Sequence, residues 1–168
     1  HQTIVSDTGL SLAWLMQTQM FHGEQLIHAW NQTPVGYGIP AAVGAAIATG
    51  GPVTLIAGDG GFSAGISELA TVARRNLPVE MHVLNNRGHG MCRQTQRQWL
   101  GGTYPATSVE GGLPDLNFEA IGAAYGLEVN EYLIDPEADL NPLVKFGHPN
   151  HDGQPLLPRE VIAAEVPA

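Results

Sequence analysis

The amino-acid sequence predicts an α/β fold of the doubly wound kind, a three-layer sandwich built on a mainly parallel sheet. Two apolar runs of strand length, residues 53–57 and 79–84, flank a segment whose apolar residues recur at helical spacing. The first run leads directly into Gly58-Asp59-Gly60-Gly61, and the second leads into Asn85-Asn86. A strand, glycine turn, helix and strand in this order join neighbouring parallel strands by a right-handed crossover.

Short elements precede this unit. Residues 3–6 predict a strand that ends in the turn 7–9, which contains a capping residue, and a helix follows over residues 10–16. His22 and His28 are not spaced for one helical face. We therefore expect them to pack at the surface or in a substrate channel, and not to form a metal pair.

The middle of the chain holds two predicted helices. Prolines and glycines keep residues 33–40 irregular, and a run of small residues then predicts a helix over 41–48. Small side chains allow another backbone to come close, so we expect this helix to be buried against the sheet or a partner. Between the two main strands, residues 62–76 predict one continuous helix.

Loops dominate the sequence after Asn86. One loop leads into a helix that ends at Trp99. Residues 101–105 and 109–114 also predict loops, and the second of these is expected to be a mobile segment over the site.

A further helix is expected near residue 120. Asp115 or Asn117 is suited to cap its first turn, and the helix is expected to run through Tyr125. Gly126 stands at the position where a left-handed residue commonly ends a helix.

Composition limits the kinds of partner. The 168 residues are enough for one domain with a real core. The net charge of −9 argues against nucleic acid and against an anionic membrane as partners. Charged residues make up only 14% of the chain, so we expect another domain or subunit to cover much of the surface.

The cysteine count and the apolar runs bear on the compartment. Cys92 is the single cysteine of the sequence, which excludes a disulfide framework and indicates a reducing, cytoplasmic location. No apolar run is long enough to span a bilayer, and no signal peptide is visible. Because a strand begins almost at His1, we interpret the chain as a piece of a longer polypeptide or as a processed chain.

The glycine turn and the asparagine pair together predict a diphosphate held through a metal ion. In a parallel sheet both turns lie at the carboxyl ends of strands, where open α/β sheets bind ligands. Glycines before a helix suit a phosphate, yet the Asp59 carboxylate would repel one. A cation between them removes the conflict, because Asp59, the Asn86 amide and a carbonyl expected at Gly88 would give Mg²⁺ three oxygen ligands.

These residues resemble the motif of thiamine-diphosphate enzymes, in which Gly-Asp-Gly is followed further along by Asn-Asn. Here 27 residues separate Asp59 from Asn86. Residues 33–42 resemble the segment beneath the cofactor, and Gly90-Met91 resembles the segment after Asn-Asn in acetolactate-synthase-like enzymes. The resemblance covers residues 1–129. It implies the diphosphate-binding domain of such an enzyme, with the corresponding fold.

The resemblance also implies which residues contact the cofactor. The residues expected to bind thiamine diphosphate are Gly9, Ser11, Thr33, Val35, Gly58, Asp59, Gly60, Gly61, Phe62, Asn86, Gly88, Gly90 and Met91, with Asp59, Asn86 and Gly88 also holding Mg²⁺. Without the resemblance, the turn at Gly9 would be interpreted only as a helix cap. Relatives carry a bulkier apolar residue at the position of Val35, where it supports the bent cofactor.

His89 is the candidate catalytic residue. Its side chain has a pKa suited to proton transfer near neutral pH. A loop histidine taken alone is more often a surface residue, but the position beside the cofactor loop favours a role in the active site.

The resemblance implies chemistry on 2-oxo acids, as in acetolactate synthase or a 2-oxo acid decarboxylase. The reaction would be decarboxylation with or without carboligation, which makes the enzyme a lyase or a transferase. In relatives, a glutamate on a separate pyrimidine-binding domain activates the cofactor, and no stretch of this sequence resembles it. The chain is therefore expected to be inactive alone and to need a pyrimidine-binding domain or subunit in a homo- or hetero-oligomer.

Two other functions remain possible at this point. One is a non-catalytic subunit or fragment that only binds the cofactor. The other is an unrelated nucleotide-binding α/β domain, although the glycine motifs of such domains are missing from the sequence.

The C-terminal end departs from the family. Relatives have a strand, a helix and a further strand beyond Gly126, but here the helix is missing and the fold is expected to be shortened. We place the thiamine-diphosphate/Mg²⁺-binding domain at residues 1–134 and a Pro/Gly-rich tail at 135–168. His148 and His151 are expected to be exposed in that tail and not to bind a metal.

Overall fold

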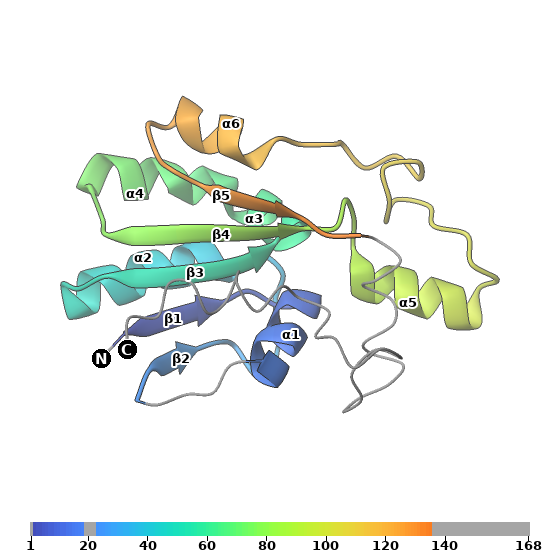
Figure 1. Cartoon of the computed structure of the whole chain (residues 1–168), viewed down its shortest axis with the longest axis horizontal. Coiled ribbons are helices and arrows are strands. Elements are labelled where there is room, and N and C mark those ends of the chain that lie inside the picture. Colours follow the sequence, from blue (N-terminus) through green and yellow to red (C-terminus); the bar gives the residue numbers. More distant parts are fainter. Residues whose placement is uncertain (1, 19–22, 136–168) are drawn as a thin grey trace.

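The computed structural model describes residues 2–18 and 23–135, and within these one sheet of five parallel strands forms the centre of the molecule (Figure 1). The strands are β1 (Thr3–Ser6), β2 (Gln25–Ile27), β3 (Val53–Gly58), β4 (Val79–Asn85) and β5 (Asn130–Leu133). Their order across the sheet is β2-β1-β3-β4-β5. The parallel sheet with its intervening helices confirms the predicted α/β fold.

Helices connect successive strands of the sheet. They are α1 (Leu10–Thr18), α2 (Gly38–Thr49), α3 (Asp59–Gly65), α4 (Leu69–Arg75), α5 (Gly90–Trp99) and α6 (Phe118–Ala124), with a 3₁₀ turn at Ile66–Glu68 between α3 and α4. Since alternate residues of a strand point to opposite faces, β3 shows which helices cover which side. Leu55 belongs to a core with Ala42 of α2, whereas Ile56 packs against Trp14 of α1.

The direction of the connections reverses beside β1. The chain passes from β1 outward to β2 and then returns across β1 to β3. Ligands of open α/β sheets bind at such a reversal, outside the carboxyl ends of the strands. In Figure 1 the carboxyl ends of β1, β3 and β4 point toward α1 and α5.

The predicted helix over residues 62–76 is wrong in two respects. It begins at Asp59, and it is interrupted by the 3₁₀ turn that follows Gly65. Gly65 is buried, and a β-carbon there would lie 3.3 Å from Ile39 Cδ1 of α2. Close packing of the two helices therefore favours glycine at a position where glycine also weakens a helix.

Three further differences lie in the amino-terminal part of the chain. Strand β2 was not predicted, since three residues are too short to show an alternating pattern. His28 follows it and is buried, with its Nδ1 2.9 Å from the carbonyl oxygen of Ser6 and its ring edge-on to Trp30. His28 is therefore not a surface residue, and the alternative expectation that it packs in a substrate channel stays a prediction. Helix α2 starts at Gly38, three positions before the predicted Ala41.

The predicted caps of α6 are confirmed in part. Asn117 Oδ1 accepts a hydrogen bond of 2.7 Å from the Ala120 N–H, so Asn117 is the cap. Asp115 forms an ion pair with Arg87 instead. Gly126 has a φ of 73°, the left-handed conformation expected at the end of the helix.

Several predictions fall on residues outside the described ranges. These are His22, His148, His151 and the tail from residue 136 onward. Within residues 2–18 and 23–135, no helix combines the length and the apolar character needed to cross a membrane.

Candidate functional site

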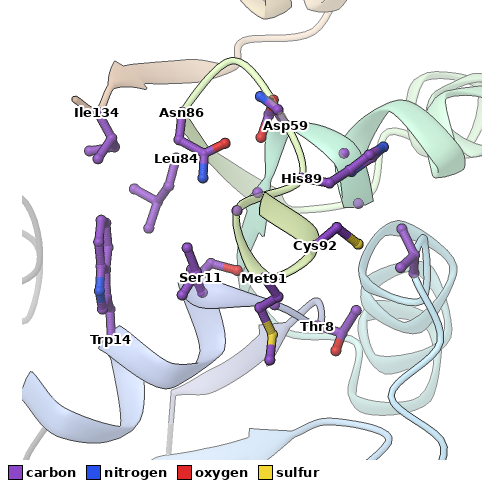
Figure 2. Close-up of a pocket in the computed structure, with 18 of the residues that line it drawn as sticks. Thr8, Ser11, Trp14, Asp59, Leu84, Asn86, His89, Met91, Cys92 and Ile134 are labelled. Carbon is purple, nitrogen blue, oxygen red and sulfur yellow. The ribbon is translucent and has the colours of Figure 1, made fainter. Parts of the chain in front are cut away.

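A cavity of about 260 Å³ lies where β1, β3 and β4 end and α1, α3 and α5 begin. Nearly all the residues that were expected to bind the cofactor line this cavity. Those on its wall are Gly9, Ser11, Thr33, Val35, Gly58, Asp59, Gly60, Gly61, Asn86, Gly88, Gly90 and Met91, together with His89. Figure 2 shows Asp59, Asn86 and His89 around this cavity, with Ser11 and Met91 on another side.

Phe62 is the exception among the nominated residues. Its side chain is fully buried and packs edge-on against Phe118, with ring centroids 5.5 Å apart. Phe62 therefore anchors α3 in the core, and its ring is not part of the cavity wall.

Asp59 and Asn86 lie at the ends of neighbouring strands. Gly58 of β3 pairs in register with Leu84 of β4, so both turns emerge at the same edge of the sheet. Asp59 Oδ2 accepts a hydrogen bond of 2.7 Å from the Gly88 N–H. Burial raises the pKa of Asp59, and this effect outweighs the lowering by the N–H groups of Gly88 and Gly60 and by nearby His89.

The side-chain oxygen of Asn86 has no hydrogen-bond donor among the described residues. Asn86 is only 7% exposed, and its Oδ1 is buried. A buried acceptor without a hydrogen bond destabilises the folded state, so this atom is a candidate contact for a bound ligand. The hydroxyl oxygen of Ser11, which is also buried at the cavity, likewise lacks a hydrogen-bond partner in the described part of the chain.

Asn85, the first residue of the asparagine pair, supports the turn and does not line this cavity. Its Oδ1 accepts a hydrogen bond of 2.8 Å from the Arg87 N–H, and its Nδ2 donates to Glu131 Oε1 of β5 at 2.6 Å. The other oxygen of Glu131 accepts from the Phe118 N–H at 2.8 Å. Glu131 therefore ties the Asn86 turn to β5 and to the start of α6, which the sequence did not reveal.

The glycines of the turn after β3 have packing roles as well. A β-carbon on Gly60 would lie 2.5 Å from His89 Nδ1, so the imidazole rests directly over this backbone. The backbone of His89 is fixed too, because its N–H donates to the Thr107 carbonyl at 3.0 Å. His89 also lines a second cavity of about 430 Å³, which shares Asp59 with the first.

The segment expected to be mobile lies against the same turn. Gly88 forms an antiparallel bridge with Ser108, and Ser108 accepts a backbone hydrogen bond of 3.0 Å from Leu113. Leu113 and Pro114 line the second cavity. The structure places this segment over the site, and its mobility stays a prediction.

Part of the cavity wall was missed. Figure 2 shows Trp14, Leu84 and Ile134 gathered on the side away from His89. Thr8, Leu10 and Cys92 complete the lining. Trp14 and Leu84 belong to predicted elements, but spacing alone did not show that their side chains would meet at a ligand site.

The possible metal ligands at this site are hard oxygen atoms. No group of three or more His, Cys, Asp or Glu side chains suited to a metal occurs among the residues that the structure describes. A carboxylate, an amide oxygen and a main-chain carbonyl form the kind of ligand set that Mg²⁺ prefers, which fits the resemblance to thiamine-diphosphate enzymes.

Comparison with known proteins shows the family of the chain. The family described as "Thiamine pyrophosphate enzyme, C-terminal TPP binding domain" matches residues 7–157. The acetolactate synthase large subunit of Pyropia yezoensis is 33% identical over 124 residues, covering 73% of this chain and 21% of that protein. The isozyme 1 large subunit of Escherichia coli K12 is 30% identical over 173 residues, covering 96% of this chain and 28% of the relative.

A shorter match is closer in sequence. The acetolactate synthase of Arthrospira platensis is 42% identical over 95 residues, which cover 56% of this chain and 16% of that protein. The chain thus spans less than a third of the length of these curated relatives. From the family match and the cavity at the strand ends, we conclude that the chain belongs to the thiamine pyrophosphate enzymes, as a C-terminal TPP-binding domain.

Proposed function

We propose that this chain holds thiamine diphosphate through Mg²⁺ and forms the diphosphate-binding half of an enzyme that acts on 2-oxo acids. The reaction would be decarboxylation with or without carboligation, of the acetolactate synthase type. The observation that carries the proposal is the buried Asn86 Oδ1, which lacks a donor among the described residues and lines the same cavity as Asp59.

The ligands of the metal follow from that observation. Asp59 supplies a carboxylate and Asn86 an amide oxygen, and we assign the third protein ligand to the Gly88 carbonyl. The N–H of Gly88 already donates to Asp59, which brings this turn and the carboxylate together. Burial raises the pKa of Asp59 and so disfavours its carboxylate form, which a bound cation would stabilise.

The diphosphate would lie against the starts of two helices. Ser11 belongs to the first turn of α1, and Gly90 with Met91 begins α5. Free N–H groups at helix starts favour anions. The Ser11 hydroxyl would donate to a phosphate oxygen, which gives a partner to a buried group that lacks one.

The remaining site residues would act at the reacting end. Thiamine diphosphate, when bound, supplies the electron sink for loss of CO₂ from a 2-oxo acid. Val35 is 59% exposed and lines both cavities, where it would support the cofactor. His89 lies between the same two cavities, where its imidazole would move a proton or hold a substrate carboxylate.

The other half of the active site would come from a pyrimidine-binding domain or subunit with the activating glutamate. Large apolar side chains are exposed near the cavity, including Met91 at 48% and Val35. Contact with that partner in a homo- or hetero-oligomer would cover them. Cys92 is exposed and unpaired, which suits a reducing, cytoplasmic setting.

Calorimetry on the full chain tests this function. We expect thiamine diphosphate to bind in the presence of Mg²⁺ and to lose its affinity when the metal is chelated. Turnover of a 2-oxo acid should then appear only after the polypeptide with the pyrimidine-binding domain is added. Metal-independent binding, or no binding, would contradict the proposal, whereas binding without turnover would indicate a non-catalytic subunit.

A further inference from the structure

A second aspartate, Asp7, is buried beneath the cavity at the end of β1. It is 1% exposed, and its carboxylate contacts main-chain N–H groups. Oδ1 accepts hydrogen bonds from Thr8 at 2.7 Å and Gly36 at 3.2 Å, and Oδ2 accepts from Gly38 at 2.7 Å. Asp7 therefore joins its own turn to the segment 33–38.

The glycine turn after β3 also packs on this carboxylate. A β-carbon on Gly61 would lie 2.6 Å from Asp7 Cγ, and one on Gly38 would lie 2.9 Å from Asp7 Oδ2. Any larger residue at Gly61 would displace the carboxylate, and one at Gly38 would displace either the carboxylate or Leu55. The turn 7–9, the segment 33–38 and the turn 58–61 thus meet at one side chain.

Each of these three segments also lines the cofactor cavity. Thr8, Thr33 and Gly61 lie on the cavity wall, whereas Asp7 does not. The segment 33–38 especially needs support, because Thr33 has a φ of 39° and Gly36 a φ of 86°. A non-glycine residue such as Thr33 seldom adopts the left-handed conformation unless contacts hold it there.

We propose that Asp7 is a positioning residue for thiamine diphosphate, acting through the backbones of the three segments without touching the cofactor. This inference rests on the proposed function. Gly36 and Gly38 lie beyond Val35 in the chain, so their hydrogen bonds to Asp7 fix where Val35 meets the cavity. Loss of the carboxylate would release that segment and lower affinity for the cofactor while the sheet remains folded.

The test compares Asp7→Asn with the wild-type chain. Asparagine keeps the shape but replaces one acceptor oxygen with an NH₂ group, which leaves at least one buried N–H without its partner. We expect the Kd of thiamine diphosphate at saturating Mg²⁺, measured by calorimetry, to rise about tenfold or more. Hydrogen exchange without cofactor should show faster exchange at the amides of Gly36 and Gly38.

Asn117→Ala is the matched control. It also removes one acceptor of a main-chain N–H, the cap of α6, but Asn117 lines neither of the two cavities. Binding is measured at the same interval below each variant's Tm, so a general loss of stability is removed from the comparison. The control should retain wild-type Kd and wild-type exchange at Gly36 and Gly38.

Gly38→Ala provides a second variant should Asp7→Asn fail to fold. Gly38 lies outside the cavity wall, and the added methyl group would press on Asp7 Oδ2 and on Leu55 Cδ1, each 2.9 Å away, without changing the charge of the carboxylate. It should raise the Kd in the same direction as Asp7→Asn. If a folded variant binds thiamine diphosphate with the same Kd as the wild-type chain, the role of Asp7 is wrong but the proposed function stands. If the wild-type chain binds no thiamine diphosphate, both the role of Asp7 and the proposed function are wrong.

Discussion

Asp7 and Asp59 follow neighbouring parallel strands, yet their carboxylates differ in burial and in hydrogen bonding. Asp7 accepts hydrogen bonds from three main-chain N–H groups and is almost completely buried. Asp59 is partly exposed at the cavity, burial raises its pKa, and its neighbour Asn86 presents an oxygen with no donor in the described part of the chain.

The difference shows that one aspartate can hold backbone segments in place while a neighbouring one stays available to bind a ligand. A buried carboxylate whose acceptors are filled by N–H groups holds backbone segments together. The Asp59 carboxylate accepts a hydrogen bond from the Gly88 N–H, but it shares its cavity with an amide oxygen that has no donor in the described part of the chain. A cation would give that amide oxygen a partner and stabilise the buried carboxylate. Substitutions at these two aspartates and at their neighbours test that contrast, beginning with the largest expected effect.

Asp59→Ala should abolish metal-dependent binding of thiamine diphosphate. The substitution removes the only carboxylate that we assign to Mg²⁺, and calorimetry with and without Mg²⁺ measures the result. Asp115→Ala is the control, because it removes the same charge from an exposed ion pair with Arg87. Unchanged cofactor affinity in the Asp59 variant would show that no metal bridge exists there.

His89→Ala tests whether the histidine near Asp59 takes part in the reaction. In the complete enzyme we expect kcat to fall, or the product ratio to shift, while cofactor affinity stays nearly constant. General acid–base catalysis typically contributes about 10²–10⁴-fold in rate. Steady-state kinetics and product analysis measure this effect. Normal turnover with normal products would show that His89 has no catalytic role.

Stability of the metal-free chain distinguishes the two aspartates directly. Asp7→Asn should lower the free energy of unfolding by about 1–3 kcal/mol, because buried N–H groups lose their acceptor. Asp59→Asn should leave it unchanged or raise it, since the folded state disfavours the charged form of that side chain. Urea unfolding at neutral pH gives the free energy of unfolding of both variants. Equal decreases in the two variants would show that Asp7 and Asp59 do not differ in their contribution to stability.

Glu131→Gln should have the smallest effect. It weakens the hydrogen bonds that hold Asn85 and the start of α6. Supporting partners of metal ligands typically contribute about 10–100-fold in affinity, and we expect the lower end because Glu131 acts through a turn. Titration of Mg²⁺ in the presence of thiamine diphosphate measures the change; an effect as large as that of Asp59→Ala would make Glu131 part of the metal site itself.

Features set by short stretches of sequence were predicted well. The pairing of β3 with β4, a cap at either Asp115 or Asn117 and the helix end at Gly126 follow from apolar periodicity and local backbone chemistry, and the structure shows that Asn117 is the cap. Nearly all of the residues that the resemblance to thiamine-diphosphate enzymes indicated lie on the cavity wall, because the glycine turn and the asparagine pair occupy adjacent strand ends.

Features set by distant contacts were not predicted. Asp7 meets Gly38 from 31 positions away, and Asn85 meets Glu131 from 46 positions away. Neither contact leaves a periodic pattern in the sequence. The break after Gly65 has the same origin, since it depends on how closely α3 approaches Ile39. Local chemistry thus indicated the candidate ligands, which stay predictions, whereas the residues that support them emerged only from the fold.

The central claim is that a cation lies between Asp59 and Asn86. Crystals of the full chain grown with thiamine diphosphate and Mn²⁺ in place of Mg²⁺ would test it by anomalous diffraction. The account predicts one anomalous peak within bonding distance of the Asp59 carboxylate, the Asn86 Oδ1 and the Gly88 carbonyl. Bound cofactor with no peak there, or with the metal held by other residues, would contradict it.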